Sequence, residues 1–111
     1  MNCFSNRLQE PYIMLKYDKE MLLFDERFVD YGCNKVQYVD HLRLIGYEFY
    51  LLGRSFAMDL VHHDSSYRKW YLSYARAAKE SKMRKVCNAY MDKAQFLYPS
   101  SAKVKICNSL Y

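Results

Sequence analysis

A chain of 111 residues, with 17% aromatic side chains and a formal net charge of +5, has the length of one domain and no more. No apolar run approaches the roughly 18 residues that a membrane helix needs. The N-terminal stretch "MNCFSNRLQEPY" lacks the basic and apolar regions of a signal peptide. We therefore expect one domain, residues 1–111, without a membrane segment, signal or anchor in this chain.

The charge is unevenly distributed. Residues 1–66 hold 7 Lys/Arg and 10 Asp/Glu, a net charge of −3, whereas residues 67–111 hold 10 Lys/Arg and 2 Asp/Glu, a net charge of +8. A basic, aromatic-rich half is compatible with nucleic-acid binding. A solvated helix face explains the pattern more simply, so we expect no nucleic-acid partner.

The first predicted elements are a strand and a helix. "EPYIMLKYD" reads as a strand over 11–17, apolar on both faces. An irregular stretch follows as far as Gly32, which is free to adopt a positive φ. Asn34 is a good N-cap, with Gln37 three residues later in a capping-box pattern. The apolar positions then recur at helical spacing until Gly46, a typical residue after a helix end.

Two further strands and two helices are predicted next. "YEFYLL" indicates a strand over 47–52, and "SFAMDLVH" one over 55–62. Ser65 or Ser66 caps a helical pattern that breaks near Ser81 and ends before Pro99. The order predicts an α/β fold with few strands, followed by C-terminal helices. Strands that look buried on both faces need neighbours that the chain does not supply, which suggests a fragment.

The four cysteines, Cys3, Cys33, Cys87 and Cys107, lie far apart and form no Cys-x-x-Cys pair. A structural zinc site is therefore not expected. Two disulfides are possible, but the spacing favours free, partly buried thiols.

Two stretches carry polar groups that could perform chemistry. In "FDERFVDYGCNKVQYVDHL", Asp25, Glu26 and Asp30 are candidates for a general base, and Asn34 and Lys35 at a helix N-terminus could bind a polar or anionic group. A capped helix beside a charged loop would contain the same residue types. From residue types alone, this structural role is favoured over a catalytic or binding role.

The second stretch is "SFAMDLVHHDSS". Asp59 and His62 are spaced so that a carboxylate and an imidazole could approach one cation such as Mn²⁺ or Zn²⁺. A metal site needs three or more ligands, so spacing alone favours a strand with solvent-facing polar residues.

Three segments in order, "EPYIMLKYD", "FDERFVDYGCNKVQYVDHL" and "GYEFYLLGRSFAMDLVHHDSS", resemble the LARGE-type glycosyltransferases, glycosyltransferase family 49. The likeness covers about residues 10–66 and continues more loosely to about residue 100. It implies the C-terminal part of a GT-A (Rossmann-like) domain. The Asp-x-Asp motif of that family is absent from the sequence, so the resemblance places it in a preceding part of the domain.

In function, the resemblance implies transfer of a xylose- or glucuronate-type sugar from a UDP-sugar to a glycan acceptor, such as an O-mannosyl glycan, with Mn²⁺ in the Golgi. It assigns Gly32, Asn34 and Lys35 to substrate binding. Asp59 and His62 match the metal-binding region, although Asp59 replaces a His of the family pattern. The isolated chain is expected to be inactive as an enzyme. The alternatives are a non-catalytic glycan-binding or interaction module and, less favoured, a basic nucleic-acid-binding protein.

Overall fold

The computed structural model describes residues 1–29, 32–58, 65–77 and 82–107. In these ranges it contains, in chain order, β1 (Cys3–Phe4), α1 (Asn34–Leu44), α2 (Ser66–Ala77), α3 (Lys82–Leu97) and β2 (Lys105–Ile106). The two short strands are parallel, with Cys3 opposite Lys105 and Phe4 opposite Ile106. Helices with a small parallel sheet agree with the α/β class. None of the helices in the described ranges is long and apolar enough to cross a membrane.

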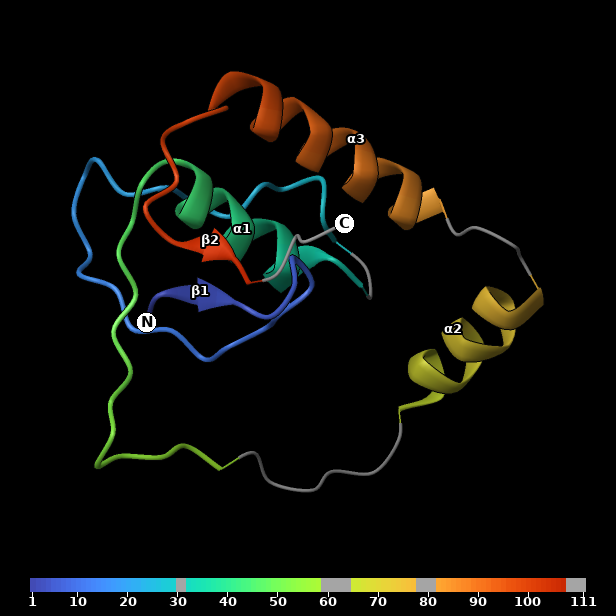
Figure 1. Cartoon of the computed structure of the whole chain (residues 1–111). Coiled ribbons are helices and arrows are strands. Elements are labelled where there is room, and N and C mark those ends of the chain that lie inside the picture. Colours follow the sequence, from blue (N-terminus) through green and yellow to red (C-terminus); the bar gives the residue numbers. More distant parts are fainter. Residues whose placement is uncertain (30–31, 59–64, 78–81, 108–111) are drawn as a thin grey trace.

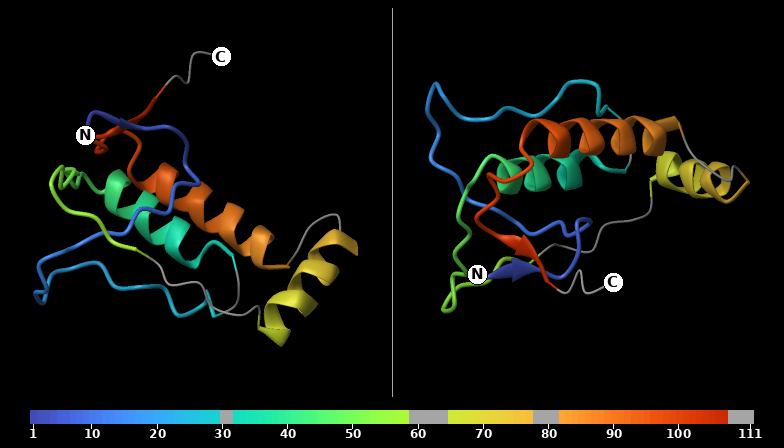
Figure 2. Two further views of the ribbon diagram at one scale, coloured as in Figure 1. Left: turned by 90° about the horizontal axis from the view of Figure 1, so that it is seen from below. Right: turned by 45° about the horizontal axis from the view of Figure 1, so that its top comes forward.

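Helix α1 lies at the centre of the molecule. It runs beside α3 in the same direction, while α2 stands at one end of this pair (Figures 1 and 2). One core cluster joins the two helices and consists of Phe28, Val36, Cys87 and Met91. A second cluster of Phe4, Val39 and Val104 joins α1 to the β1–β2 pair. A helix that packs against two cores is buried on most of its circumference, which also brings polar side chains inside.

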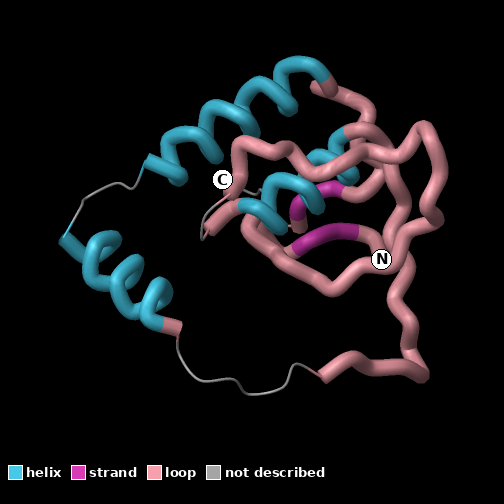
Figure 3. Tube along the Cα trace, turned by 180° about the vertical axis from the view of Figure 1, so that it is seen from behind, coloured by secondary structure: helices cyan, strands magenta, loops and turns pink. Residues whose placement is uncertain are grey.

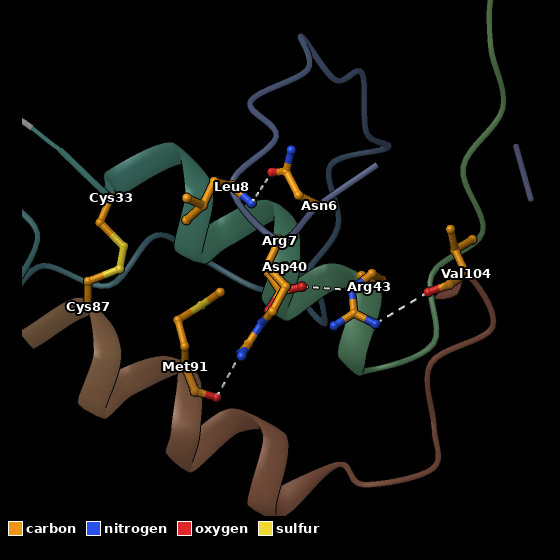
Figure 4. A network of polar contacts seen from close by, with 9 residues as sticks. All are labelled: Asn6, Arg7, Leu8, Cys33, Asp40, Arg43, Cys87, Met91 and Val104. Carbon is orange, nitrogen blue, oxygen red and sulfur yellow. Dashed lines mark hydrogen bonds and ion pairs between the residues drawn. A yellow bond between two sulfur atoms is a disulfide. The ribbon is translucent and has the colours of Figure 1, made fainter. Parts of the chain in front are cut away.

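The polar side chains on the inner side of α1 form an ion-pair network (Figure 4). The guanidinium of Arg43 donates to Asp40 over 2.7 Å, and that of Arg7 reaches the same carboxylate over 3.3 Å. Arg43 and Arg7 also donate to the backbone carbonyls of Val104 and Met91. Every buried polar side-chain atom in the described part of the chain has a partner, as buried polar groups require.

The ends of α1 follow local rules. Tyr47 N donates to Leu42 O over 3.1 Å and Gly46 N to Arg43 O over 3.2 Å, the Schellman pattern, with Gly46 at φ +96°. The prediction that Gly46 follows the end of α1, as its C′ residue, is confirmed. The predicted N-cap is wrong by one residue, because Cys33 occupies that position, with φ 67° and no side-chain cap bond.

The predicted start of α2 and the predicted end of α3 are confirmed. Ser65 Oγ accepts a hydrogen bond of 3.0 Å from Arg68 N, so this serine caps α2. Helix α3 ends at Leu97, two residues before Pro99. The chain forms two helices here, as predicted, although the predicted break at Ser81 lies outside the described residues.

The predicted strands are wrong wherever the structure describes them. Residues 11–17, 47–52 and 55–58 are loops, shown in pink in Figure 3, and positions 59–62 lie outside the described residues. A strand needs a partner to take its backbone hydrogen bonds, and the described part of the chain offers these segments none. Many of their apolar side chains are exposed, with Tyr50 80% and Phe56 89% exposed, whereas Ile13 and Phe49 pack against the second core cluster.

The prediction of free thiols is also wrong. Disulfides join Cys3 to Cys107 and Cys33 to Cys87, across Cα–Cα distances of 5.1 Å and 6.0 Å. Both separations fall in the usual range for a disulfide. Distance along the sequence gave no hint of this pairing, because β1–β2 pairing and α1–α3 packing bring the partners together only in the fold.

Candidate functional site

The predicted substrate-binding residues Gly32, Asn34 and Lys35 lie together at the start of α1. Gly32 has φ +96° and is followed by Cys33 at φ 67°, so two successive residues adopt a left-handed conformation. The disulfide from Cys33 to Cys87 fastens this turn to α3 (Figure 4). The first turn of the helix is thus held by a covalent link at its entry.

Within this turn, the Asn34 side chain stays close to its own backbone. Its Oδ1 accepts a hydrogen bond of 3.0 Å from Lys35 N, and Gln37 Nε2 donates to the Asn34 carbonyl over 3.1 Å. Asn34 therefore shapes the helix start in this structure, and Lys35 is the residue whose side chain projects from it.

Lys35 stands at the rim of a half-open pocket of about 350 Å³. The pocket has mainly apolar and aromatic walls, formed by Pro11, Tyr12, Ile13, Leu15, Met21, Phe24, Lys35, Tyr38 and Val39. The ammonium lies 5.7 Å from the centre of the Tyr12 ring and 3.4 Å from a carboxylate oxygen of Glu10. One cation over aromatic walls suits a ligand with an apolar face and a hydroxyl or carboxylate edge.

The aromatic wall of the pocket is fixed in place. Phe24 stacks on Tyr38, with ring centroids 4.0 Å apart, and Tyr38 donates its hydroxyl to Leu22 O over 2.8 Å. These contacts attach the loop that precedes α1 to the helix itself. The pocket wall is consequently preorganised by a stack and a hydrogen bond.

Asp25, one of the three candidates for a general base, is occupied by an ion pair. Arg27 donates to its two oxygens over 2.9 Å and 2.6 Å, and these hydrogen bonds lower the pKa of Asp25 to about 2. A base works best with a pKa near the operating pH, so Asp25 is poorly suited to that role. Glu26 is exposed to solvent, and Asp30 lies outside the described residues.

A second titratable cluster lies on the α3 side of α1, and the sequence gave no sign of it. The ring nitrogen Nδ1 of His41 lies 2.5 Å from the Tyr90 hydroxyl, and the Arg27 guanidinium lies 5.5 Å from the centre of the Tyr90 ring. Burial lowers the pKa of His41 and keeps the ring neutral near neutral pH, although Asp40 and Asp25 oppose this effect. His41 and Tyr90 are 49 positions apart in the sequence, so no local motif shows that they are close.

The predicted metal residues Asp59 and His62 lie outside the described residues. Among the residues that are described, no group of three or more His, Cys, Asp or Glu side chains could hold a metal ion. The described residues instead form a pocket beside the start of α1, which a disulfide holds in place.

Comparisons with known proteins agree with the resemblance. A family model described as "Glycosyl-transferase for dystroglycan" matches residues 5–99. A protein of Caenorhabditis elegans, "Glycosyltransferase-like protein LARGE", is 36% identical over 62 residues, which cover 55% of this chain and 10% of that protein. The chain thus spans about a tenth of the length of this curated relative. No solved structure matches.

Proposed function

Because this chain belongs to glycosyltransferase family 49, the glycosyltransferases for dystroglycan, we propose that it forms the acceptor-binding part of a sugar-transfer domain. In that domain a xylose- or glucuronate-type sugar passes from a UDP-sugar to a hydroxyl of a glycan. The match to residues 5–99 includes Gly32, Asn34 and Lys35 together with the pocket beside them. A GT-A architecture for the whole domain is part of this proposal.

The observation that carries the proposal is the Lys35 ammonium at the mouth of an aromatic pocket. A pyranose has one face of C–H groups, which can lie on Tyr12 or Phe24, and a rim of hydroxyls that an ammonium can donate to. A uronate would add a carboxylate and replace Glu10 as the partner of Lys35 over a similar distance. These features support a sugar, and an acidic sugar in particular, as the proposed ligand of the pocket.

Deprotonation of the acceptor hydroxyl needs a general base. The Asp25 carboxylate is a weak one, since Arg27 lowers the pKa of Asp25 to about 2. We assign binding and orientation to the described residues. Donor binding, for which the sequence has no Asp-x-Asp motif, belongs to another segment of the intact protein. On this basis the isolated chain binds glycans without transferring sugar.

Manganese at Asp59 and His62 stays a prediction from the family resemblance. Carboxylate oxygen and imidazole nitrogen are chemically suitable ligands for that ion, which when bound would act as a Lewis acid on the diphosphate of the donor. Line broadening by Mn²⁺ in NMR spectra of the chain, compared with the Asp59→Asn variant, would show whether these residues bind the ion.

A Golgi location is likewise a proposal, and the two disulfides support it. Disulfides persist in the oxidising compartments of the secretory pathway and are rare in the cytosol. Residence in the secretory lumen would place the chain where glycan acceptors are modified.

The test is binding of glucuronate-containing disaccharides to the purified chain, followed by NMR or calorimetry. We expect weak binding that Lys35→Met reduces about tenfold, the effect of one hydrogen bond to a charged group. Lys93→Met, at an exposed position on α3, is the matched control and should bind normally. Addition of UDP-xylose or UDP-glucuronate with Mn²⁺ should give no product. Sugar transfer by the isolated chain, or equal binding by the Lys35→Met variant, would overturn the proposal.

A further inference from the structure

Helix α2 carries a row of exposed aromatic side chains. Tyr67, Trp70 and Tyr74 follow the spacing i, i+3, i+7 and so share one face of the helix. Their side chains are 41%, 57% and 37% exposed. Ring centroids lie 5.7 Å apart for Tyr67 and Trp70 and 5.5 Å apart for Trp70 and Tyr74, and the latter two planes differ by only 10°. The three rings therefore form one contiguous aromatic row on α2.

This row is connected to the candidate acceptor site. Tyr71 stacks with Tyr67, and the Tyr71 hydroxyl lies 3.1 Å from the position that a Cβ at Gly32 would take. A side chain at Gly32 would have to push this hydroxyl away by a few tenths of an ångström, and the φ of +96° at this position favours glycine in any case. The Tyr71 contact thus places α2 beside the turn that precedes Lys35. The helix that carries the aromatic row stands at one end of the α1–α3 pair (Figure 2).

The helix that bears the row is basic. Its sequence, "SYRKWYLSYARA", contains three basic residues and no acidic one, and Lys69, next to Trp70, is exposed. Residues 67–111 as a whole carry a net charge of +8. Aromatic rings with positive charges beside them complement a ligand that has both flat apolar faces and negative charges.

We propose that the aromatic face of α2 binds the extended part of an anionic acceptor oligosaccharide. The sugar at the reactive end lies in the Lys35 pocket, and the following sugars stack on Tyr67, Trp70 and Tyr74. The acidic sugars of the same strand face Arg68 and Lys69 of α2. This inference rests on the proposed function, since it extends the same binding site along a longer acceptor.

A second copy of the chain or a nucleic acid could also cover aromatic rings. Charge argues against pairing of α2 with the α2 helix of a second copy, because two basic helices repel each other. The connection through Tyr71 to Gly32 favours a ligand that continues from the pocket. An acidic glycan satisfies both conditions.

The experiment compares the affinities of glucuronate-containing disaccharides, tetrasaccharides and octasaccharides for the 111-residue chain. We expect the octasaccharide to bind at least about tenfold more tightly than the disaccharide, since exposed Trp and Tyr side chains commonly dominate contact energies. The double variant Trp70→Ala/Tyr74→Ala should lose this gain and keep the affinity for the disaccharide. Phe96→Ala, another strongly exposed aromatic position, is the matched control and should retain the gain. Circular dichroism checks that the helices persist.

The outcomes separate this inference from the proposed function. Normal disaccharide binding with no gain for the octasaccharide, or with a gain that survives in the double variant, overturns the role of α2 alone. Loss of disaccharide binding to the wild-type chain removes the proposed function as well. Tighter binding of a poly-uridylate RNA that the octasaccharide fails to displace, or concentration-dependent dimerisation through Trp70, also overturns the inference.

Discussion

Arg43 donates its Nε–H to Asp40 Oδ1 over 2.7 Å, and both side chains are almost completely buried between the two cores. The pair lies one helical turn apart on α1, and Arg7 approaches the same carboxylate from the N-terminal segment. The single negative charge of Asp40 therefore pairs with two guanidinium groups. Its loss would leave positive charge inside the molecule without compensation.

We expect Asp40→Asn to lower the free energy of unfolding by about 3–5 kcal/mol, the cost of breaking a buried ion pair by removing one partner. Urea unfolding followed by circular dichroism measures this. Glu48→Gln is the control, because Glu48 pairs with Lys103 at the surface, where water screens the charges, so its midpoint should barely move. Equal unfolding midpoints for the two variants would contradict the prediction.

The two disulfides should contribute similar amounts to the free energy of unfolding. Replacement of Cys33 and Cys87 by Ser should lower the free energy of unfolding by about 2–5 kcal/mol, and so should replacement of Cys3 and Cys107. The bridge between Cys3 and Cys107 closes a longer loop than the bridge between Cys33 and Cys87, but the entropy of loop closure grows only slowly with loop length. Only the replacement of Cys33 and Cys87 should also weaken disaccharide binding, because Cys33 adjoins the turn that presents Lys35. Unchanged binding in that variant would show that the turn keeps its shape without the bridge.

Asp25 should titrate near its shifted pKa of about 2. Its folded-state pKa lies below the ordinary value of 3.8, so the ion pair with Arg27 stabilises the fold above about pH 4 and this contribution is lost as the pH falls toward 2. Carboxyl ¹³C shifts measure the titration directly. Arg27→Gln should return the midpoint toward 3.8, whereas a midpoint near 3.8 with Arg27 present would disprove the pairing.

His41 should make stability depend on pH at mildly acidic values. Burial lowers its pKa in the folded state, so below the ordinary value of 6.5 the unfolded chain binds the proton better and the free energy of unfolding decreases as the pH falls. Urea midpoints at pH 7.5, 6.5 and 5.5 should follow this trend, and His41→Gln should flatten it. Tyr90→Phe removes the hydrogen bond but keeps the ring that buries His41, so the trend should persist. Loss of the trend in Tyr90→Phe would point to the hydroxyl instead of burial.

The exposed apolar loop over 47–58 should make the isolated chain prone to self-association. Apolar side chains that face water on an extended segment offer a surface for other chains. The double variant Leu51→Lys/Leu52→Lys should reduce the aggregated fraction in size-exclusion chromatography with light scattering. Leu8→Lys, at an exposed but isolated position, should not. A monodisperse wild-type monomer at high concentration would refute this expectation.

Features with local causes could be predicted from the sequence. Gly46 ends α1 because its backbone tolerates a positive φ, and Ser65 starts α2 because its hydroxyl accepts from an amide three residues later. The same holds for the grouping of Gly32, Asn34 and Lys35 at one helix start. These signals need only a few neighbouring residues.

Features that depend on distant partners could not be predicted. The apolar segment over 11–17 has strand-like composition, but composition does not supply a neighbouring strand. Cysteine pairing and the contact of His41 with Tyr90 depend on how α1 packs against α3. The pocket beside Lys35 likewise combines walls from the N-terminal loop and α1. In each case the tertiary arrangement decides what the side chain meets.

The two disulfides also determine how the molecule would respond to a protease. Arg54 lies in the exposed loop, between the half of the chain that contains Cys3 and Cys33 and the half that contains Cys87 and Cys107. Cleavage after Arg54 by a trypsin-like enzyme would therefore give two pieces held together by two covalent bridges, with α1 still fastened to α3. The nicked protein would remain one covalently linked molecule until a reductant separated the pieces.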